Sequence, residues 1–230
     1  MKRRLKSALE IISNGENWQV ICSTHSPFLI NVAEDPMSLL IIRKNRNRLV
    51  EKQQLIEDPF NRETMRGERE ILRALLDFHP SVCEAFFAKR VVLVEGDSEV
   101  AVFRHAGSLL DFFGLNRDLV NDTTIISCDG KWTIPAVATV LRELGIPFKI
   151  VHDLDRKNRT EEELNNLANL DPYRANAKIE NVTAGEVPIF RVEDTLEDIL
   201  WPGDVAVPSR DKPYRAWRRV NELINNGELE

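Results

Sequence analysis

Four acidic side chains stand at two places where an apolar run of the sequence ends. Glu95 and Glu99 follow the first run in "VVLVEGDSEVAVF", and Asp153 and Asp155 end a later one in "FKIVHDLD". Side chains two residues apart in an extended segment share a face, so Asp153 and Asp155 can point at one spot. Converging carboxylates repel one another unless a cation lies between them, and hard oxygen ligands suit Mg²⁺ or Mn²⁺. These acids are therefore candidate ligands of a metal centre.

Each acidic motif also has a purely structural interpretation. Gly96 permits a tight turn after Glu95. Asp97 or Ser98 can cap the next helix, which has Glu99 in its first turn. An Asp-x-Asp pair is common in turns, because turns are rich in Asp. The metal-site hypothesis therefore depends on the two motifs lying side by side.

The pattern around the acids predicts an α/β fold. From residue 90 onward, apolar runs alternate with helical spacing, with strands expected at 90–94, 123–128 and 148–155 and helices at 100–113 and 134–144. This alternation is typical of a mostly parallel sheet with helices on its faces. Ligands of such sheets bind beyond the carboxyl ends of the strands, which is where the acids stand. Glu95 would lie beside Asp153 and Asp155 if their strands are neighbours.

The sequence predicts three segments. Residues 1–58 indicate a small α/β piece with a helix in "KRRLKSALEII", an apolar strand in "WQVICS" and a hairpin in "SLLIIRKNRNRLVEKQQ". Residues 59–89 indicate a helical connector in which Pro80 separates two helices. Residues 90–230 contain the acids and form the candidate catalytic domain.

Composition restricts the class of protein. The chain has 230 residues, of which 43% are hydrophobic and 30% charged, and this describes a globular chain of one or two domains. No apolar run approaches the roughly 18 residues of a membrane span, and no signal peptide is recognisable, so we expect a cytoplasmic protein. The three cysteines are far apart without a CxxC pair, which argues against a disulfide framework or a cysteine zinc site.

The motifs resemble those of the Toprim domains found in topoisomerases, bacterial primases and several nucleases. The match is an apolar strand ending in Glu-Gly, here "VLVEG", and a later strand ending in Asp-x-Asp, here "IVHDLD". Within that superfamily the chain looks most like the C-terminal part of the OLD (overcoming lysogenisation defect) nucleases, which couple an ABC-type ATPase to a Toprim nuclease. The segments "FFAKRVVLVEGDSE", "CDGKWTIPAVATVLRELGIPFKIVHDLD" and "ICSTHSPFLI" carry this resemblance.

The resemblance implies a Toprim-like fold and an endonuclease that cleaves DNA with two Mg²⁺ or Mn²⁺ ions. It makes the following residues metal ligands: Glu95, Glu99, Asp153, Asp155, Thr195 and Glu197. Glu95 can alternatively transfer a proton, and Lys212 would lie near the scissile phosphate. "TLED" at 195–198 also fits a capping box that opens a helix, with Thr195 as the cap. An exposed lysine at a helix start, such as Lys212, is also common.

The segment "SRDKPYRAWRRV" concentrates positive charge in a chain whose net charge is -6. Its five cations are Arg210, Lys212, Arg215, Arg218 and Arg219. A cluster of this kind is suited to the phosphate backbone of DNA. The alternative is a solvated helix face whose buried stripe consists of Trp217, Val220 and either Leu223 or Ile224.

The N-terminal motif "ICSTHSPFLI" resembles the end of the switch-histidine strand of an ABC-type ATPase, with His25 as the switch residue. No GxxxxGK[ST] loop occurs in the chain, so we expect the chain alone neither to bind nor to hydrolyse ATP. The expected partner is an ATPase domain, either in a longer form of the protein or on another chain, and a homodimer is an alternative way to cover the apolar surface. Two other functions remain open: RNA cleavage by the same site, and a non-catalytic module whose carboxylates bind a structural cation.

Overall fold

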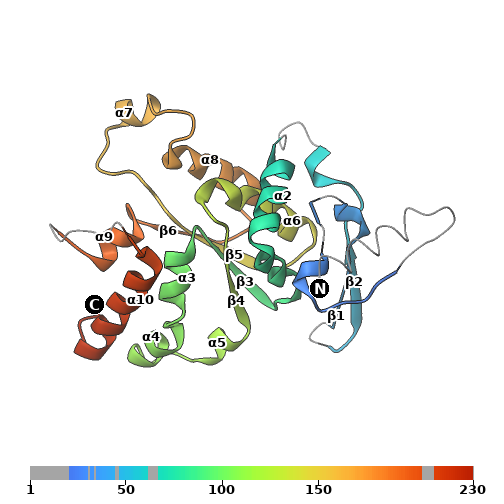
Figure 1. Cartoon of the computed structure of the whole chain (residues 1–230), viewed down its shortest axis with the longest axis horizontal. Coiled ribbons are helices and arrows are strands. Elements are labelled where there is room, and N and C mark those ends of the chain that lie inside the picture. Colours follow the sequence, from blue (N-terminus) through green and yellow to red (C-terminus); the bar gives the residue numbers. More distant parts are fainter. Residues whose placement is uncertain are drawn as a thin grey trace.

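A parallel four-stranded sheet forms the centre of the computed structural model, which describes residues 21–30, 32–33, 35–44, 47–61, 67–203 and 210–229. The strands are β3 (Arg90–Val94), β4 (Thr123–Ser127), β5 (Phe148–Asp153) and β6 (Ile189–Val192), and their order across the sheet is β4-β3-β5-β6. All three pairings are parallel. The predicted α/β fold with a mostly parallel sheet is confirmed, and β6 adds a fourth strand to the three expected (Figure 1).

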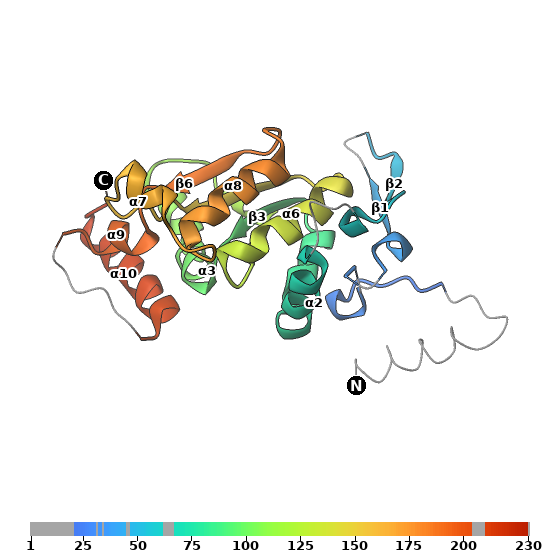
Figure 2. The same ribbon diagram turned by 90° about the horizontal axis from the view of Figure 1, so that it is seen from above.

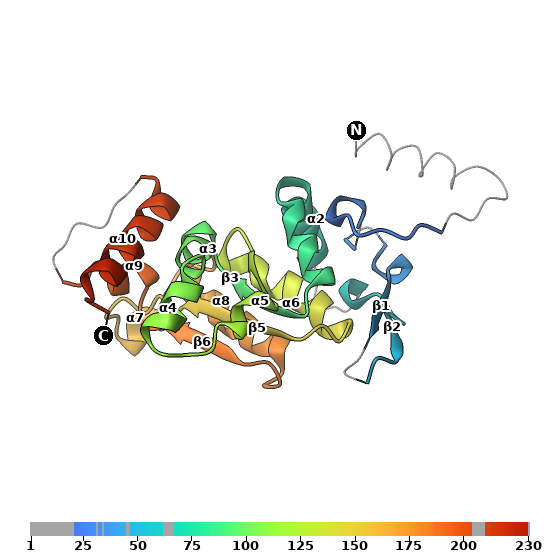
Figure 3. The same cartoon turned by 90° about the horizontal axis from the view of Figure 1, so that it is seen from below.

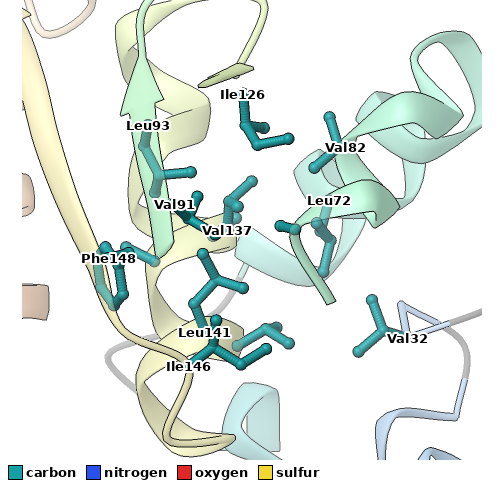
Figure 4. Packing of buried hydrophobic residues seen from close by; sticks show 14 of the residues in the cluster. Val32, Leu72, Val82, Val91, Leu93, Ile126, Val137, Leu141, Ile146 and Phe148 are labelled. Atoms are coloured by element: carbon teal, nitrogen blue, oxygen red, sulfur yellow. The ribbon is translucent and has the colours of Figure 1, made fainter. Parts of the chain in front are cut away.

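One face of the sheet is buried under helix α6 (Ile134–Glu143), with α2 (Glu68–Phe78) and α8 (Pro172–Thr183) beside it. Eight consecutive residues of α6, Ile134 to Leu141, are buried, because the helix lies between the sheet and the other two helices. Figure 4 shows Val137 and Leu141 of this helix packed towards Val91 and Leu93 of the sheet. This apolar core fixes the positions of β3 and β5.

A second group of helices packs at the other end of the molecule. It contains α3 (Asp97–Phe103), α4 (Ala106–Phe112), α9 (Leu196–Leu200) and α10 (Lys212–Asn226). Helix α10 lies beside α3 and α4 (Figure 1 and Figure 3). A small apolar cluster of Leu200, Ala216 and Val220 lies between these helices. Two short helices, α5 (Asp118–Asn121) and α7 (Glu161–Asn165), complete this half.

The single helix expected over residues 100–113 is wrong, because α3 ends at Phe103 and α4 begins at Ala106. His105 leaves the helical conformation, with φ -88° and ψ 1°. Its ring is buried, and Nε2 lies 2.9 Å from the backbone oxygen of Trp217 in α10. The contact between α10 and this junction accompanies the break that apolar spacing alone did not reveal.

The N-terminal part lies at the opposite end from α10 (Figure 2). The predicted hairpin is confirmed as antiparallel strands β1 (Leu40–Lys44) and β2 (Val50–Gln54). Of the two connector helices, the first is α2, whereas the second, Pro80–Phe87, is a 3-10 helix called η5. Other 3-10 turns are η1 (Pro27–Leu29), η2 (Pro36–Ser38), η3 (Pro59–Asn61) and η6 (Lys131–Thr133).

The expected strand "WQVICS" lies only partly within the described residues, and the helix "KRRLKSALEII" lies wholly outside them. Residues 21–26 form neither helix nor strand, so the expectation that a strand runs directly into His25 is wrong for this segment. The residues after His25 form the 3-10 turn η1, and its ring contacts Phe87 at a centroid distance of 6.4 Å.

Candidate metal centre

The two acidic motifs lie side by side, because β3 and β5 are hydrogen-bonded neighbours that point in the same direction. Glu95 directly follows β3, and Asp153 is the last residue of β5. One carboxylate oxygen of Glu95, Oε1, accepts a hydrogen bond of 2.7 Å from the backbone N–H of Asp153. The carboxyl ends of adjacent parallel strands thus place both acids at one edge of the sheet, as the sequence predicts.

Asp155 reaches this edge by a route that the sequence interpretation missed. The extended segment expected through Asp155 ends at Asp153, and Asp155 has a left-handed backbone with φ 57°. Asp tolerates this conformation better than most residues. The backbone N–H of Asp155 donates to the carbonyl of Asp194, and Asn176 of α8 donates to the carbonyl of Leu154. The turn is therefore held from both sides.

Lys131 lies among these acids and was not among the predicted site residues. Its ammonium Nζ lies 2.8 Å from Oδ2 of Asp155 and 3.9 Å from Oε1 of Glu95, and it also donates to the backbone oxygen of Asp153. Only 2% of the Lys131 side chain is exposed. A buried lysine needs a charge partner, and this one has Asp155.

The loop after β4 places Lys131. Gly130 has φ 124°, a conformation that favours glycine, and its N–H donates to the carbonyl of Glu95 at 2.7 Å. Thr133 closes the loop by donating to the carbonyls of Cys128 and Gly130. The signal for Lys131 was present in the sequence as "CDGK" after the second strand, because that strand ends at the same sheet edge.

Glu95 and Asp153, called the inner acids here, lie in an environment that disfavours their charged forms. Burial raises the pKa of Asp153 to about 8, and the nearby Glu95 contributes to the rise. Burial also raises the pKa of Glu95 to about 7, although Lys131 and the N–H of Asp153 oppose the shift. Without further positive charge, one or both acids hold a proton near neutral pH.

Glu99 and Glu197 form an outer pair. Glu99 is buried in the first turn of α3, and Oε2 accepts a hydrogen bond of 3.1 Å from the backbone N–H of Gly96. The cap of α3 is therefore Gly96 with Glu99, and neither Asp97 nor Ser98 serves as expected. Gly96 has extended backbone with φ -152°, so its turn does not require glycine.

Burial raises the pKa of Glu99, and the charge of Glu197 adds to the rise. Glu197 also contacts Lys212, whose Nζ lies 2.8 Å from Oε1 of Glu197. The predicted ligand Glu197 and the predicted phosphate-binding Lys212 therefore meet at the start of α10.

The capping-box interpretation of "TLED" is confirmed. The hydroxyl of Thr195 accepts from the N–H of Asp198, and Asp198 accepts from the N–H of Thr195 at 3.0 Å. The N–H of Leu196 in the same turn donates to Oδ1 of Asp153 at 3.0 Å. Thr195 is thus engaged in starting α9, and α9 in turn orients the carboxylate of Asp153.

The donor chemistry of this edge fits Mg²⁺ or Mn²⁺. The groups that converge are carboxylates, and the raised pKa values of Glu95 and Asp153 are lowered by a cation between them. Within the described ranges, no three His, Cys, Asp or Glu side chains are already arranged around a common ion position. These carboxylates are therefore chemically suitable ligands for Mg²⁺ or Mn²⁺. In the structure, the positive charge beside Asp155 comes from Lys131.

The cations of the basic segment lie on α10 or just before it. Lys212, Arg215 and Arg218 are exposed, and Arg218 pairs with Glu222 at 2.8 Å. Arg219 is half-buried and donates to the carbonyl of Leu200, so part of its role is structural. Arg210 is exposed in the bend before the helix.

The stripe expected on the buried side of α10 is partly wrong. Ala216 and Val220 are buried there, whereas Trp217 is 41% exposed. Ile224 is half-buried and packs against the same cluster. The buried side of the helix is therefore shifted away from Trp217.

Comparison with known proteins bears directly on this sheet edge. Residues 86–155, which contain β3, β4, α6, β5 and the inner acids, match the family model of the overcoming lysogenization defect protein-like TOPRIM domain. This match confirms the resemblance to the Toprim domains of OLD proteins.

Two further similarities extend beyond this Toprim segment. The chain is 29% identical over 213 residues to a protein named OLD nuclease from Thermus scotoductus, covering 89% of the chain and 38% of that protein. It thus spans well under half of that relative. Among solved structures, the C-terminal region of the Burkholderia pseudomallei OLD protein aligns with 63% of this chain and 77% of its own, at a TM-score of 0.35 and 15% identity.

No helix in the described part of the chain is long and apolar enough to cross a membrane.

Proposed function

We propose that the chain is the catalytic part of a divalent-metal-dependent endonuclease that cleaves phosphodiester bonds in DNA. The observation that carries the proposal is the meeting of Glu95, Asp153 and Asp155 at the carboxyl edge of adjacent parallel strands. The match of residues 86–155 to the OLD-like Toprim model and the similarity to an OLD nuclease support it.

The predicted ligands of the ions are Glu95, Glu99, Asp153, Asp155 and Glu197, with Thr195 as a further expected member. When two Mg²⁺ or Mn²⁺ ions are bound, they supply the charge that activates water and stabilises the leaving oxygen. The carboxylates must be deprotonated to act as ligands, so metal loading is coupled to proton release from Glu95 and Asp153. Burial makes the loss of these protons unfavourable when no ions are bound. Glu95 and Asp153 are therefore fully charged only when the ions are present.

The remaining side chains act on the nucleic acid. Lys212 lies at the start of α10 against Glu197, and its exposed ammonium can turn from that carboxylate towards a phosphate. Arg210, Arg215 and Arg218 offer further positive charge on the same exposed segment. These cations would hold the backbone beside the carboxylates.

One observation favours a second candidate, a non-catalytic module. Lys131 already provides a cation to Asp155, so the cluster can be stable without any metal. In that case the carboxylates would serve structure alone, metal ions would not change the stability of the protein, and no cleavage would occur in their presence.

Plasmid DNA and RNA incubated with Mg²⁺, Mn²⁺, Ca²⁺ or a chelator test these alternatives. We expect Mg²⁺- or Mn²⁺-dependent nicking that is lost on chelation and in Asp153→Asn. The matched control is Asp122→Asn, which removes a carboxylate that precedes β4 at the opposite edge and pairs with Lys89. Full metal-dependent nicking by Asp153→Asn would remove this site from the mechanism, and cleavage of RNA alone would correct the substrate.

A further inference from the structure

Three aromatic rings are in contact between the α3–α4 junction and α10. His105 and Trp217 have ring centroids 5.4 Å apart with planes inclined by 35°. Trp217 and Tyr214 are stacked, with centroids 6.4 Å apart and planes inclined by 19°. The exposed fraction rises along this series, from 9% for His105 through 41% for Trp217 to 59% for Tyr214. The series therefore runs from the interior to solvent.

The protein holds these rings on a rigid support. His105 Nε2 lies 2.9 Å from the backbone oxygen of Trp217, which ties the junction to the middle of α10. On the same helix, Ala216 and Val220 are buried against α3, α4 and α9. Tyr and Trp side chains have only two rotatable χ angles, so a ring fixed in this way loses little conformational entropy on binding.

Cations surround the exposed rings. Arg215 and Arg218 follow Tyr214 by one and four residues, and both are exposed. The pKa of Arg218 is raised first by its hydrogen bond to Glu222 and also by its interaction with the hydroxyl of Tyr214. Aromatic faces between positive charges are suited to nucleic acid, because the cations meet phosphates and the rings meet bases.

The aromatic surface adjoins the carboxylate site. Lys212, two residues before Tyr214, contacts Glu197 at 2.8 Å. Helix α10 also packs along α3, whose first turn contains Glu99. A strand bound along the exposed side of α10 would therefore reach the acids.

We propose that Tyr214 and Trp217 form a stacking surface for unpaired bases, so that the substrate is nucleic acid with a single-stranded segment next to the cleavage site. This inference rests on the proposed nuclease function. Bases in an intact duplex hide their faces in the stack, whereas bases of a single strand can lie on exposed rings. Phosphate contacts alone would not distinguish the two.

The test compares oligonucleotides of equal length and charge in a chelating buffer, which prevents cleavage. The probes are a single strand, a blunt duplex, and an abasic strand that keeps the sugar-phosphate backbone but lacks bases. We expect the chain to bind the base-bearing strand more tightly than the other two by fluorescence anisotropy. Tyr214→Ala should weaken binding of that strand by roughly 5- to 100-fold and leave binding of the abasic strand unchanged.

Two variants serve as controls. Tyr214→Phe keeps the ring and should bind like the unchanged chain. Phe190→Ala removes a ring that is 53% exposed on β6 and should also leave binding unchanged. As a second readout, the base-bearing strand should quench tryptophan fluorescence more than the abasic strand, and Trp217→Phe should remove this difference.

The failures of the inference and of the proposed function are distinguishable. Equal affinity of the chain for base-bearing and abasic strands, with metal-dependent cleavage intact, would overturn the stacking surface and leave the nuclease in place. A preference for the blunt duplex would do the same. Absence of both nucleic-acid binding and cleavage would overturn the function and this inference together.

Discussion

Two lysine–carboxylate contacts in this protein have the same length and opposite surroundings. Lys131 meets Asp155 at 2.8 Å with 2% of the lysine side chain exposed, and Lys212 meets Glu197 at 2.8 Å with 51% exposed. A buried pair is costly to break, because the partner left behind keeps an uncompensated charge. An exposed pair contributes little, because water and salt screen it. The buried contact can hold the fold of the site, and the exposed one is free to exchange its partner for a substrate.

The largest effect expected from this comparison is that of Lys131→Met. Removing the ammonium leaves Asp155 without its buried partner, so we expect the free energy of unfolding to fall by about 3 kcal/mol. Urea denaturation in a chelating buffer measures this change. Added Mn²⁺ should restore part of the loss if a metal ion can replace the ammonium. A variant as stable as the unchanged chain would show that the buried contact is no stronger than the exposed one.

The two acids of the Asp-x-Asp motif should differ in their effect on stability. Asp155→Asn leaves Lys131 without its carboxylate and should destabilise the metal-free protein by about 1–3 kcal/mol. Asp153→Asn removes an acid whose pKa burial raises to about 8, so stability at pH 8 should hold or rise. Thermal unfolding of both variants at that pH gives the comparison. Equal losses would mean that Lys131 does not distinguish the two acids.

The pH dependence of the metal-free protein follows from the inner acids. The folded-state pKa values of about 7 for Glu95 and about 8 for Asp153 lie above the unfolded values near 4, so the folded state binds more protons between these limits. The free energy of unfolding should therefore be highest below this window and fall as the pH rises from about 5 to 8. Melting temperatures in chelating buffer across this range test the sign, and Asp153→Asn should show a shallower fall.

The smallest effect on stability is expected for Lys212→Ala. The exposed contact with Glu197 should contribute no more than about 1 kcal/mol to folding. If Lys212 faces the charge that develops on the phosphate, the variant should slow turnover much more than it weakens DNA binding. Lys89→Ala is a matched control, because it removes another exposed lysine whose carboxylate partner, Asp122, is exposed as well. A loss of stability in Lys212→Ala comparable to that of Lys131→Met would remove the contrast between the pairs.

The sequence predicted the parts of the site that depend on strand ends. The acid after β3 and the acids at the end of β5 were recognisable because apolar runs stop there, and the parallel pairing of β3 with β5 brings them together. The position of Lys131 just after β4 was recognisable in "CDGK", but its burial among the acids was not, since that depends on the loop between β4 and α6. Asp155 illustrates the same limit, because its left-handed backbone is set by contacts with Asp194 and α8.

Errors in the helices have a similar origin. Apolar spacing predicted one helix over residues 100–113, but the packing of His105 against α10 accompanies a break. It also assigned Trp217 to the buried side of α10, although Ala216 and Val220 occupy that side. In both cases the local apolar pattern allowed more than one arrangement of the helix, and contacts between distant parts of the chain determined which one forms.

The order of the strands has a consequence for how the protein acquires its site during synthesis. Strand β3 pairs with both β4 and β5, and Glu95 is separated from Asp153 by 58 residues of chain. A ribosome therefore releases the first acid well before the second, and Glu197 later still. Contacts so distant in sequence form only after the intervening chain has been made. Glu95, Asp153 and Asp155 can therefore meet only after β5 has been made, and Glu197 can join them only after β6 and the turn that follows it.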